Sequence, residues 1–167
     1  LIEEKVLIPA SSVKGAISHR TTYYYNLLND KFINKGGNAD IVESIFGAKK
    51  DKEKDSFKGN ILISDVYLDK TSSKVFDHVS IDRFTGGAID SALFQEKTIA
   101  SKETFTLEIL INKEKVEVKE NDEGKIALEA FEKALKDITT GMLSLGGATT
   151  KGHGIFSGKV LKNGVEI

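Results

Sequence analysis

Two segments of the chain place apolar residues three or four positions apart, which is the spacing of one face of an α-helix. In residues 11–28 the recurring apolar side chains are those of Val13, Ala16, Ile17, Tyr24, Leu27 and Leu28. In residues 125–138 they are those of Ala127, Ala130, Phe131, Ala134, Leu135 and Ile138, while Glu129, Lys133, Lys136 and Asp137 lie off this stripe. We therefore predict two amphipathic helices over these segments, and a short helix over residues 39–46.

Other segments have the pattern of β-strands, in which successive side chains point to opposite faces. Phe105, Leu107, Ile109 and Ile111 alternate with mostly polar residues, which predicts a strand with one buried face. Residues 61–68 and 155–161 also predict strands, and residues 5–8 have the composition of the end of another. Residues 47–58 carry many alternating charges and predict a mobile surface loop.

The predicted order is helix, strand, long excursion, strand, helix, strand. With a first strand that ends near Ile8, it becomes β-α-β-β-α-β, the split βαβ arrangement of ferredoxin-like (RRM-like) α+β domains. We expect a single domain over residues 1–167, with a long insertion at roughly 69–102 that is either functional or disordered. Because the chain starts at Leu1 and its only methionine is Met142, we also expect residues upstream, with part or all of the first strand among them.

The composition excludes several classes of protein. The chain has no cysteine, which excludes disulfides, thiolate metal sites and a thiol nucleophile. No apolar run reaches the length of a membrane-spanning helix and no signal peptide is evident, so we expect a cytoplasmic protein without membrane contact.

The net charge of −1 argues against nucleic-acid binding. The charge is unevenly distributed, however, since residues 138–167 carry three lysines and one acidic residue. A local basic surface can bind phosphate even in a neutral domain. The only two arginines are Arg20 and Arg83, and arginine is the residue best suited to bidentate phosphate contacts.

Ser11, Ser12, Lys14 and Gly15 lie at the start of the first predicted helix. Free backbone amides and the helix dipole make such an end attractive to phosphate. Lys14 adds a positive charge, and Gly15 permits close approach. The alternative is an ordinary serine cap followed by a surface lysine. The residues alone leave both interpretations open.

A glycine-rich segment at residues 146–154 follows the last predicted helix. It contains four glycines, namely Gly146, Gly147, Gly152 and Gly154. Successive glycines can turn backbone amides inward to form an anion-binding nest, and Thr149, Thr150 and Lys151 supply hydroxyls and a charge. The alternative is a connection whose backbone needs positive φ angles.

The excursion at residues 69–102 contains Phe76, Ile81, Phe84 and Phe94, which are able to wedge between bases or stack on them. The alternative is that these side chains pack a small satellite core, which we favour for Phe94. Arg83, in the same excursion, has a guanidinium that is able to reach a phosphate.

The sequence gives no reason to expect a metal or a cofactor. His19, His78 and His153 are too far apart in sequence to form a zinc-binding pair. Two of the aspartates Asp65, Asp69, Asp77, Asp82 and Asp90 could form a Mg²⁺-binding pair. Aspartates are common at strand ends and in loops, so we favour that interpretation for most of them.

Four blocks occur in order along most of the chain. They are residues 8–17 (IPASSVKGAI); Ile45-Phe46-Gly47 with Gly59 and Asp65; Ser80-Ile81-Asp82-Arg83 followed by Gly86, Gly87, Leu93 and Phe94; and residues 145–154 (LGGATTKGHG). Together they resemble the CRISPR-associated RAMP superfamily, and in particular the backbone subunits that hold guide RNA in type III interference complexes. The resemblance implies RNA-binding roles for Ser11, Ser12, Lys14, Gly15, Arg20, Arg83, Gly146, Gly147, Thr149, Thr150, Lys151, Gly152 and His153.

The chain departs from the family pattern at several positions. Ala10 stands where the family usually has glycine, and Lys151 replaces a frequent arginine. Ser18 stands where backbone subunits often have arginine, so Arg20 is a candidate substitute. Nuclease-bearing members have a catalytic aspartate before the first block. Residues 1–8 contain only Glu3 and Glu4 as acidic residues, so any such aspartate would lie upstream of Leu1.

We therefore expect a structural subunit of a type III interference complex in antiviral defence, and we favour a chain without enzymatic activity of its own. Its expected partners are guide RNA, target RNA and other RAMP subunits. One alternative is a RAMP endoribonuclease that processes guide-RNA precursor, with His19 as the acid or base. The other is a protein-interaction module that has lost RNA binding, which the negative net charge keeps open.

Overall fold

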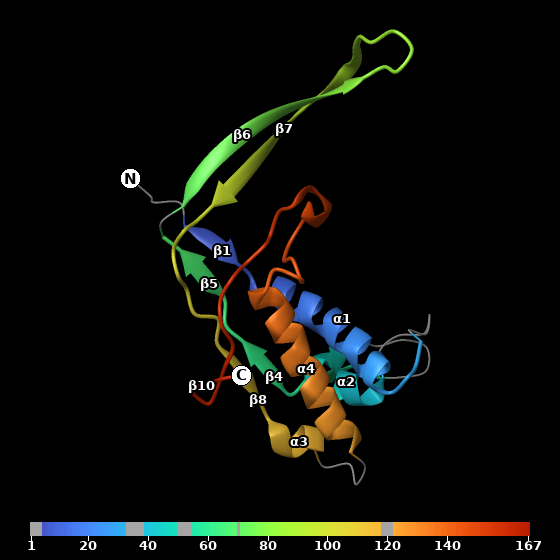
Figure 1. Ribbon diagram of the computed structural model, residues 1–167, viewed down its shortest axis with the longest axis vertical. Coiled ribbons are helices and arrows are strands. Elements are labelled where there is room, and N and C mark those ends of the chain that lie inside the picture. Colours follow the sequence, from blue (N-terminus) through green and yellow to red (C-terminus); the bar gives the residue numbers. More distant parts are fainter. Residues whose placement is uncertain (1–4, 33–38, 50–54, 70, 118–121) are drawn as a thin grey trace. The chain divides into compact units, whose positions relative to one another are not determined.

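The computed structural model describes residues 5–32, 39–49, 55–69, 71–117 and 122–167 (Figure 1). Contacts between residues divide the chain into two compact units. The first unit comprises residues 1–8 and 66–106, and the second comprises residues 9–65 and 107–167. The predicted insertion lies inside the first unit. Each unit is described by itself.

The second unit is built around two long helices. Its helices are α1 (Ala10–Leu28), α2 (Asp40–Phe46), α3 (Lys113–Glu117) and α4 (Glu123–Thr139), with a short 3₁₀ helix η1 (Thr149–Lys151). Helices α1 and α4 pack against each other and run in opposite directions (Figure 1). Their contact surface includes side chains that are fully buried, among them Val13, Ile17, Ala127, Ala130 and Ala134. Both long helices and the short α2 are confirmed.

Three two-stranded antiparallel sheets belong to the second unit. They pair β4 (Ile61–Ile63) with β8 (Ile109–Ile111), β2 (Gly47–Ala48) with β3 (Phe57–Lys58), and β9 (Leu161–Lys162) with β10 (Val165–Glu166). The first unit contains two more, which pair β1 (Val6–Ile8) with β5 (Val66–Leu68) and β6 (Ser72–Ile81) with β7 (Ala88–Ala100). The protein is therefore a mixed α+β structure with small antiparallel sheets. The ferredoxin-like connectivity and the single domain stay predictions.

Several predicted element boundaries were wrong. The strand predicted over residues 61–68 is two strands, interrupted at Ser64 and Asp65. The two strands pair with different partners, β4 with β8 and β5 with β1, and between them the Asp65 carboxylate accepts a hydrogen bond from the backbone of Ala10. The loop predicted over residues 47–58 has paired ends, β2 and β3, while residues 50–54 lie outside the described residues.

Two further strands are shorter than predicted. The strand expected over residues 105–111 includes only Ile109–Ile111. Residues 155–160 are not a strand, because Gly158 donates its amide hydrogen to Thr139 O (3.0 Å) at the end of α4. In α1, Tyr25 is buried, whereas Leu27 and Leu28, which the pattern placed on the apolar face, are exposed.

Gly59 permits the close approach of two backbone segments in the second unit. A Cβ atom at this position would overlap backbone atoms of Ile45 and Phe46 at the end of α2. Glycine is therefore required where the chain passes α2 before entering β4. This gives a structural reason for a glycine at this place in the second of the four blocks.

Among the described residues, no helix combines the length and the apolar character needed to cross a membrane.

We predict that Gly154→Ala destabilises the protein. Gly154 closes the glycine-rich segment by accepting a hydrogen bond from Leu145 N (2.9 Å), and its φ of 73° lies in the left-handed region. An L-residue in this conformation costs about 1–2 kcal/mol, and a Cβ would also overlap Leu145 O. Urea denaturation should show a loss in free energy of unfolding of at least that size.

Gly147→Ala is the matched control in the same segment. No heavy atom lies within 4 Å of the position its Cβ would take, and its φ is not positive. The stability of this variant should stay within about 0.5 kcal/mol of the original, as for ordinary surface changes. Equal stabilities of the two variants would contradict the closure between Leu145 and Gly154.

Candidate nucleic-acid interface

The start of α1 is capped by a carboxylate and not by a serine. Pro9 precedes the helix, and no side-chain cap bond forms at its N-terminus from Ser11 or Ser12, which lie inside the first turn. Instead Asp65 Oδ1 accepts a hydrogen bond of 2.7 Å from Ala10 N. The serine cap, which the sequence left open as the alternative, does not form. A negative charge here is stabilised by the helix dipole and occupies one of the amides that a phosphate would use.

The exposed face of α1 contains most of the predicted residues of the first block. Ser12, Gly15 and His19 are exposed and follow one another at helical spacing, and Ser11 is exposed beside them. No heavy atom lies within 4 Å of the position that a Cβ of Gly15 would take, so the space there is open. Lys14 is partly exposed. This face leaves room for a ligand to approach the helix backbone.

The glycine-rich segment forms a compact turn around η1. Ala148 accepts hydrogen bonds from the amides of Lys151 (2.9 Å) and His153 (3.4 Å), and the amide of Gly152 donates to Thr149 O (3.0 Å). The amides of Lys151, Gly152 and His153 are therefore used inside the turn, and the anion-binding nest of the successive glycines stays a prediction. Ala148 itself has a φ of 54°, an uncommon left-handed conformation for a residue other than glycine.

The turn presents side chains to solvent. Thr149, Thr150 and Lys151 are exposed, and His153 is partly exposed. Gly146, Gly147 and Gly152 have no heavy atom within 4 Å of their Cβ positions. The segment therefore offers two hydroxyls and an ammonium group on an uncrowded surface, a set of donors suited to phosphate oxygens.

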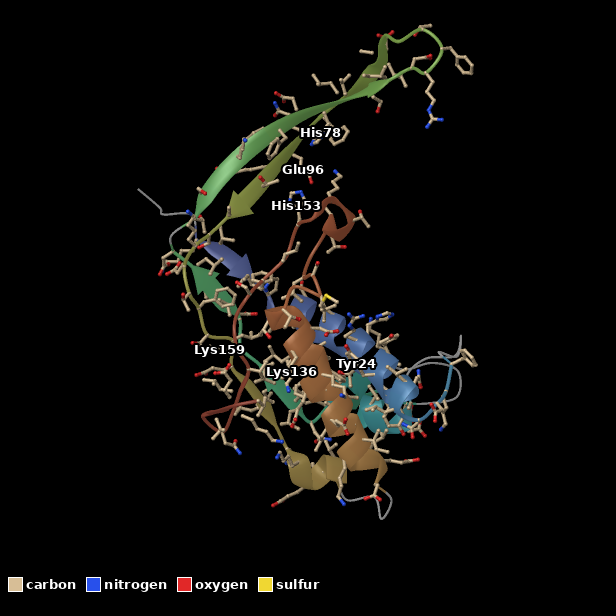
Figure 2. All side chains as sticks on the ribbon, viewed as in Figure 1. Tyr24, His78, Glu96, Lys136, His153 and Lys159 are labelled. Carbon is tan, nitrogen blue, oxygen red and sulfur yellow. The ribbon has the colours of Figure 1, made fainter. Side chains whose placement is uncertain are left out.

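A buried ion pair joins α1 to α4. Arg20 Nε donates to Asp137 Oδ2 over 2.5 Å, and Tyr24 OH lies 2.9 and 3.1 Å from the two carboxylate oxygens of Asp137. Arg20 Nη2 also donates to Met142 O over 3.1 Å. Figure 2 labels Tyr24 on α1 in this region. Burial, as the larger cause, and the hydrogen bond to Asp137, as the next, raise the pKa of the Tyr24 phenol above its ordinary value.

The sequence interpretation missed this pair. Asp137 was placed off the apolar stripe of α4, but it is buried, with 9% of its surface exposed. Its position three residues after Ala134 on the buried face was the available signal. Arg20 was assigned to RNA, whereas two of its nitrogens donate within the protein. Its direct contact with RNA stays a prediction.

The tip of the β6–β7 hairpin, in the first unit, is organised by Asp82. The carboxylate oxygen Oδ1 accepts hydrogen bonds from the amides of Phe84 (2.7 Å) and Thr85 (3.0 Å). These bonds, that of Thr85 first, hold the pKa of Asp82 below its ordinary value. The turn leaves Phe84 99% exposed and Arg83 exposed beside it. An aromatic ring and a guanidinium are thus held outward at the tip.

The satellite core considered for the excursion does not form among the described residues. Phe76, Ile81 and Phe94 are 39, 63 and 51% exposed. Phe94, which we expected to pack, stacks on His78 across the hairpin at 4.9 Å between ring centroids. His78 also lies 3.1 Å from Glu96, and Figure 2 shows both on the hairpin.

Comparison with known proteins places the chain in a family. A model of the RAMP superfamily matches residues 2–157. The chain belongs to the RAMP superfamily. A search of curated proteins gave no significant match. RAMP proteins are CRISPR-associated, and membership indicates a role connected with RNA binding.

In this RAMP protein the predicted RNA-binding residues divide between the two units. Arg83 belongs to the first unit and the others to the second. Within the described ranges, histidine and acidic side chains do not gather in groups of three or more that would hold a metal ion. Glu3 and Glu4, the acidic residues before the first block, lie outside the described residues.

We predict that the hairpin tip stays ordered at a pH where an ordinary aspartate is half protonated. The hydrogen bonds from Thr85 and Phe84 favour the ionised form of Asp82 in the folded state, so the midpoint of its titration should lie below the ordinary value of 3.8. The amide NMR shifts of Phe84 and Thr85, followed downward from pH 7, should therefore have completed less than half of their change at pH 3.8.

Asp82→Asn supplies the control, because its amide oxygen still accepts both hydrogen bonds but does not titrate. Its Phe84 and Thr85 shifts should be independent of pH, whereas Asp82→Ala should show the shifts of an open turn throughout. A midpoint at or above 3.8 in the original protein would contradict the arrangement at the tip.

Proposed function

We propose that this RAMP protein binds guide RNA as a structural subunit of a type III CRISPR interference complex in antiviral defence. The observation that carries the proposal is the superfamily match over residues 2–157, which includes all four blocks of the sequence. Its expected partners are guide RNA, target RNA paired with it, and other RAMP subunits.

The second unit supports the proposal with two exposed sets of polar groups. One is the face of α1 that contains Ser11, Ser12 and Gly15, and the other is the turn that contains Thr149, Thr150 and Lys151. Hydroxyls, lysines and open backbone contact phosphates without reading bases. A guide-RNA subunit needs contacts of this kind, since it must accept guides of any sequence.

The β6–β7 hairpin supports a second proposed contact with RNA. Strands β6 and β7 have 10 and 13 residues, and apolar side chains are exposed on both of their faces. A two-stranded hairpin is marginally stable without further packing, so a surface of this kind favours a partner. We propose that Phe84 and Arg83 at its tip contact RNA, by stacking and by charge.

The net charge of −1 limits how the protein binds RNA. Attraction at a distance is weak for such a chain, so affinity must come from local contacts at Lys14, Lys151 and Arg83. Neutralised phosphates release counterions. Binding should therefore be measurable at low salt and should fall as salt is raised.

We predict that Lys14→Ala and Lys151→Ala each weaken the binding of single-stranded RNA to a similar degree for unrelated sequences. Each variant should also reduce the slope of log affinity against log salt by about 0.7, the value for one phosphate contact on a single strand. Filter binding at several salt concentrations with two RNA sequences measures both effects.

Lys125→Ala is the matched control. Lys125 is an exposed lysine in the first turn of α4, at the end of that helix away from the glycine-rich segment. Its replacement should leave both affinity and slope unchanged. No RNA binding at low salt by the folded chain would contradict the proposal. A loss that depends on RNA sequence would mean that these lysines read bases.

The alternative in which the chain processes RNA has its own test. We predict that His19→Ala leaves RNA binding nearly unchanged and that the chain does not cleave labelled guide-RNA precursor in the presence of chelator, because acid–base cleavage needs partners that stabilise charge. Cleavage in chelator that His19→Ala abolishes would establish the processing enzyme instead. Cleavage only with Mg²⁺ would assign a catalytic role to an aspartate.

A further inference from the structure

The glycine-rich segment is held at its base by bonds to the two long helices. Helix α4 ends at Thr139, and the chain turns back so that Leu143 N donates to Asp137 O over 2.9 Å. On the returning side, Gly158 N donates to Thr139 O over 3.0 Å. The residues that flank the glycine-rich segment on both sides are therefore attached to the last turn of α4.

A third attachment comes from α1. The Arg20 guanidinium donates from Nη2 to Met142 O and from Nε to the Asp137 carboxylate. The Arg20 side chain thus binds Asp137 in the last turn of α4 and also Met142, which lies between α4 and the glycine-rich segment. Asp137 contributes twice, through its carboxylate to Arg20 and through its carbonyl to Leu143.

The chemistry of the cluster fits a positioning role. The side chains of Arg20 and Asp137 are 28 and 13% exposed, so most of the surface of each side chain faces protein. A buried carboxylate is costly unless it is paired and hydrogen-bonded, and here Arg20 and Tyr24 supply both partners. The planar guanidinium has donors in a fixed fork, so it can bond two acceptors at once, as a lysine ammonium cannot do with the same geometry.

We propose that Arg20 is a positioning residue, which together with Asp137 and Tyr24 fixes the base of the glycine-rich segment so that Thr149, Thr150 and Lys151 are presented to RNA. Arg20 then supports RNA binding through the segment and makes no phosphate contact of its own. The inference rests on the proposed function and replaces the direct role that the sequence suggested for Arg20.

The test compares Arg20→Lys, Arg20→Ala, Asp137→Asn, the double variant of Arg20→Lys with Asp137→Asn, and Tyr24→Phe in the full chain. Arg20→Lys keeps the charge and loses the fork, while Tyr24→Phe removes one hydroxyl and is the mildest change if another variant fails to fold. Each variant is first shown to be folded by circular dichroism at the assay temperature. RNA affinity, its salt slope, and hydrogen exchange of the amides at residues 141–154 are then measured.

A positioning role has a specific signature. Arg20→Lys and Asp137→Asn should each weaken RNA binding by roughly fivefold, and the double variant by no more than the worse single one, because both remove the same network. The salt slope should stay unchanged, since no phosphate contact is lost. Amide exchange should accelerate in residues 141–154 and not in the rest of α1. Tyr24→Phe should show the same pattern with smaller changes.

Other outcomes overturn the inference. If Asp137→Asn and Tyr24→Phe bind RNA normally while Arg20→Ala lowers the salt slope by about 0.7, Arg20 contacts phosphate directly. If amide exchange in the segment is unchanged in every folded variant, the cluster does not position it. Lys151→Ala in the same assay distinguishes a failure of the inference about Arg20 from a failure of the proposed function. If Lys151→Ala reduces the salt slope, the proposed RNA binding stands even when the positioning role of Arg20 is contradicted. If the original chain does not bind RNA, both the proposed function and the role of Arg20 are contradicted.

Discussion

The buried carboxylate of Asp137 is the constraint on which the second unit depends. An unpaired charge between two helices would oppose their packing. The partners of Asp137, Arg20 and Tyr24, stand four residues apart on α1 and therefore on one face of that helix. A shift of either helix by one turn would separate the carboxylate from both. The pair therefore fixes how far α1 and α4 are displaced along each other, which apolar contacts among alanines, valine and isoleucine would specify less sharply.

A second carboxylate organises the other end of α1. Asp65 interrupts what the sequence presents as one strand and accepts a hydrogen bond from the first amide of the helix. Asp65, which lies between the two strands, thus also accepts a hydrogen bond from one of the amides that have no partner within α1. Because the cap is negative, a phosphate near this end would be held by the exposed face of α1 and by lysine, with less help from the helix terminus than its sequence suggests.

The elements with strong periodicity could be predicted from the sequence, and those set by distant partners could not. The apolar spacing of α1 and α4 was enough to locate both helices, since it reflects a face buried along their length. The division of residues 61–68 depends on two distant strands, because β4 pairs with β8 and β5 pairs with β1. The burial of Asp137 depends on Arg20. The exposure of side chains on β6 and β7 depends on a long hairpin, which no local sequence pattern predicts. For the candidate site, the sequence identified the exposed groups of the glycine-rich segment and missed the internal bonds that hold it.

The β6–β7 hairpin has a consequence for the behaviour of the protein in solution. Among the described strands, β6 and β7 pair only with each other, so each has an outer edge of backbone groups not used in a sheet ladder. Exposed edges of this length are templates on which a further strand can add, and the apolar side chains on both faces would strengthen such an addition. Protein kept at high concentration without a partner should therefore self-associate through this hairpin, unless the charged side chains along its two strands oppose the approach of a second copy.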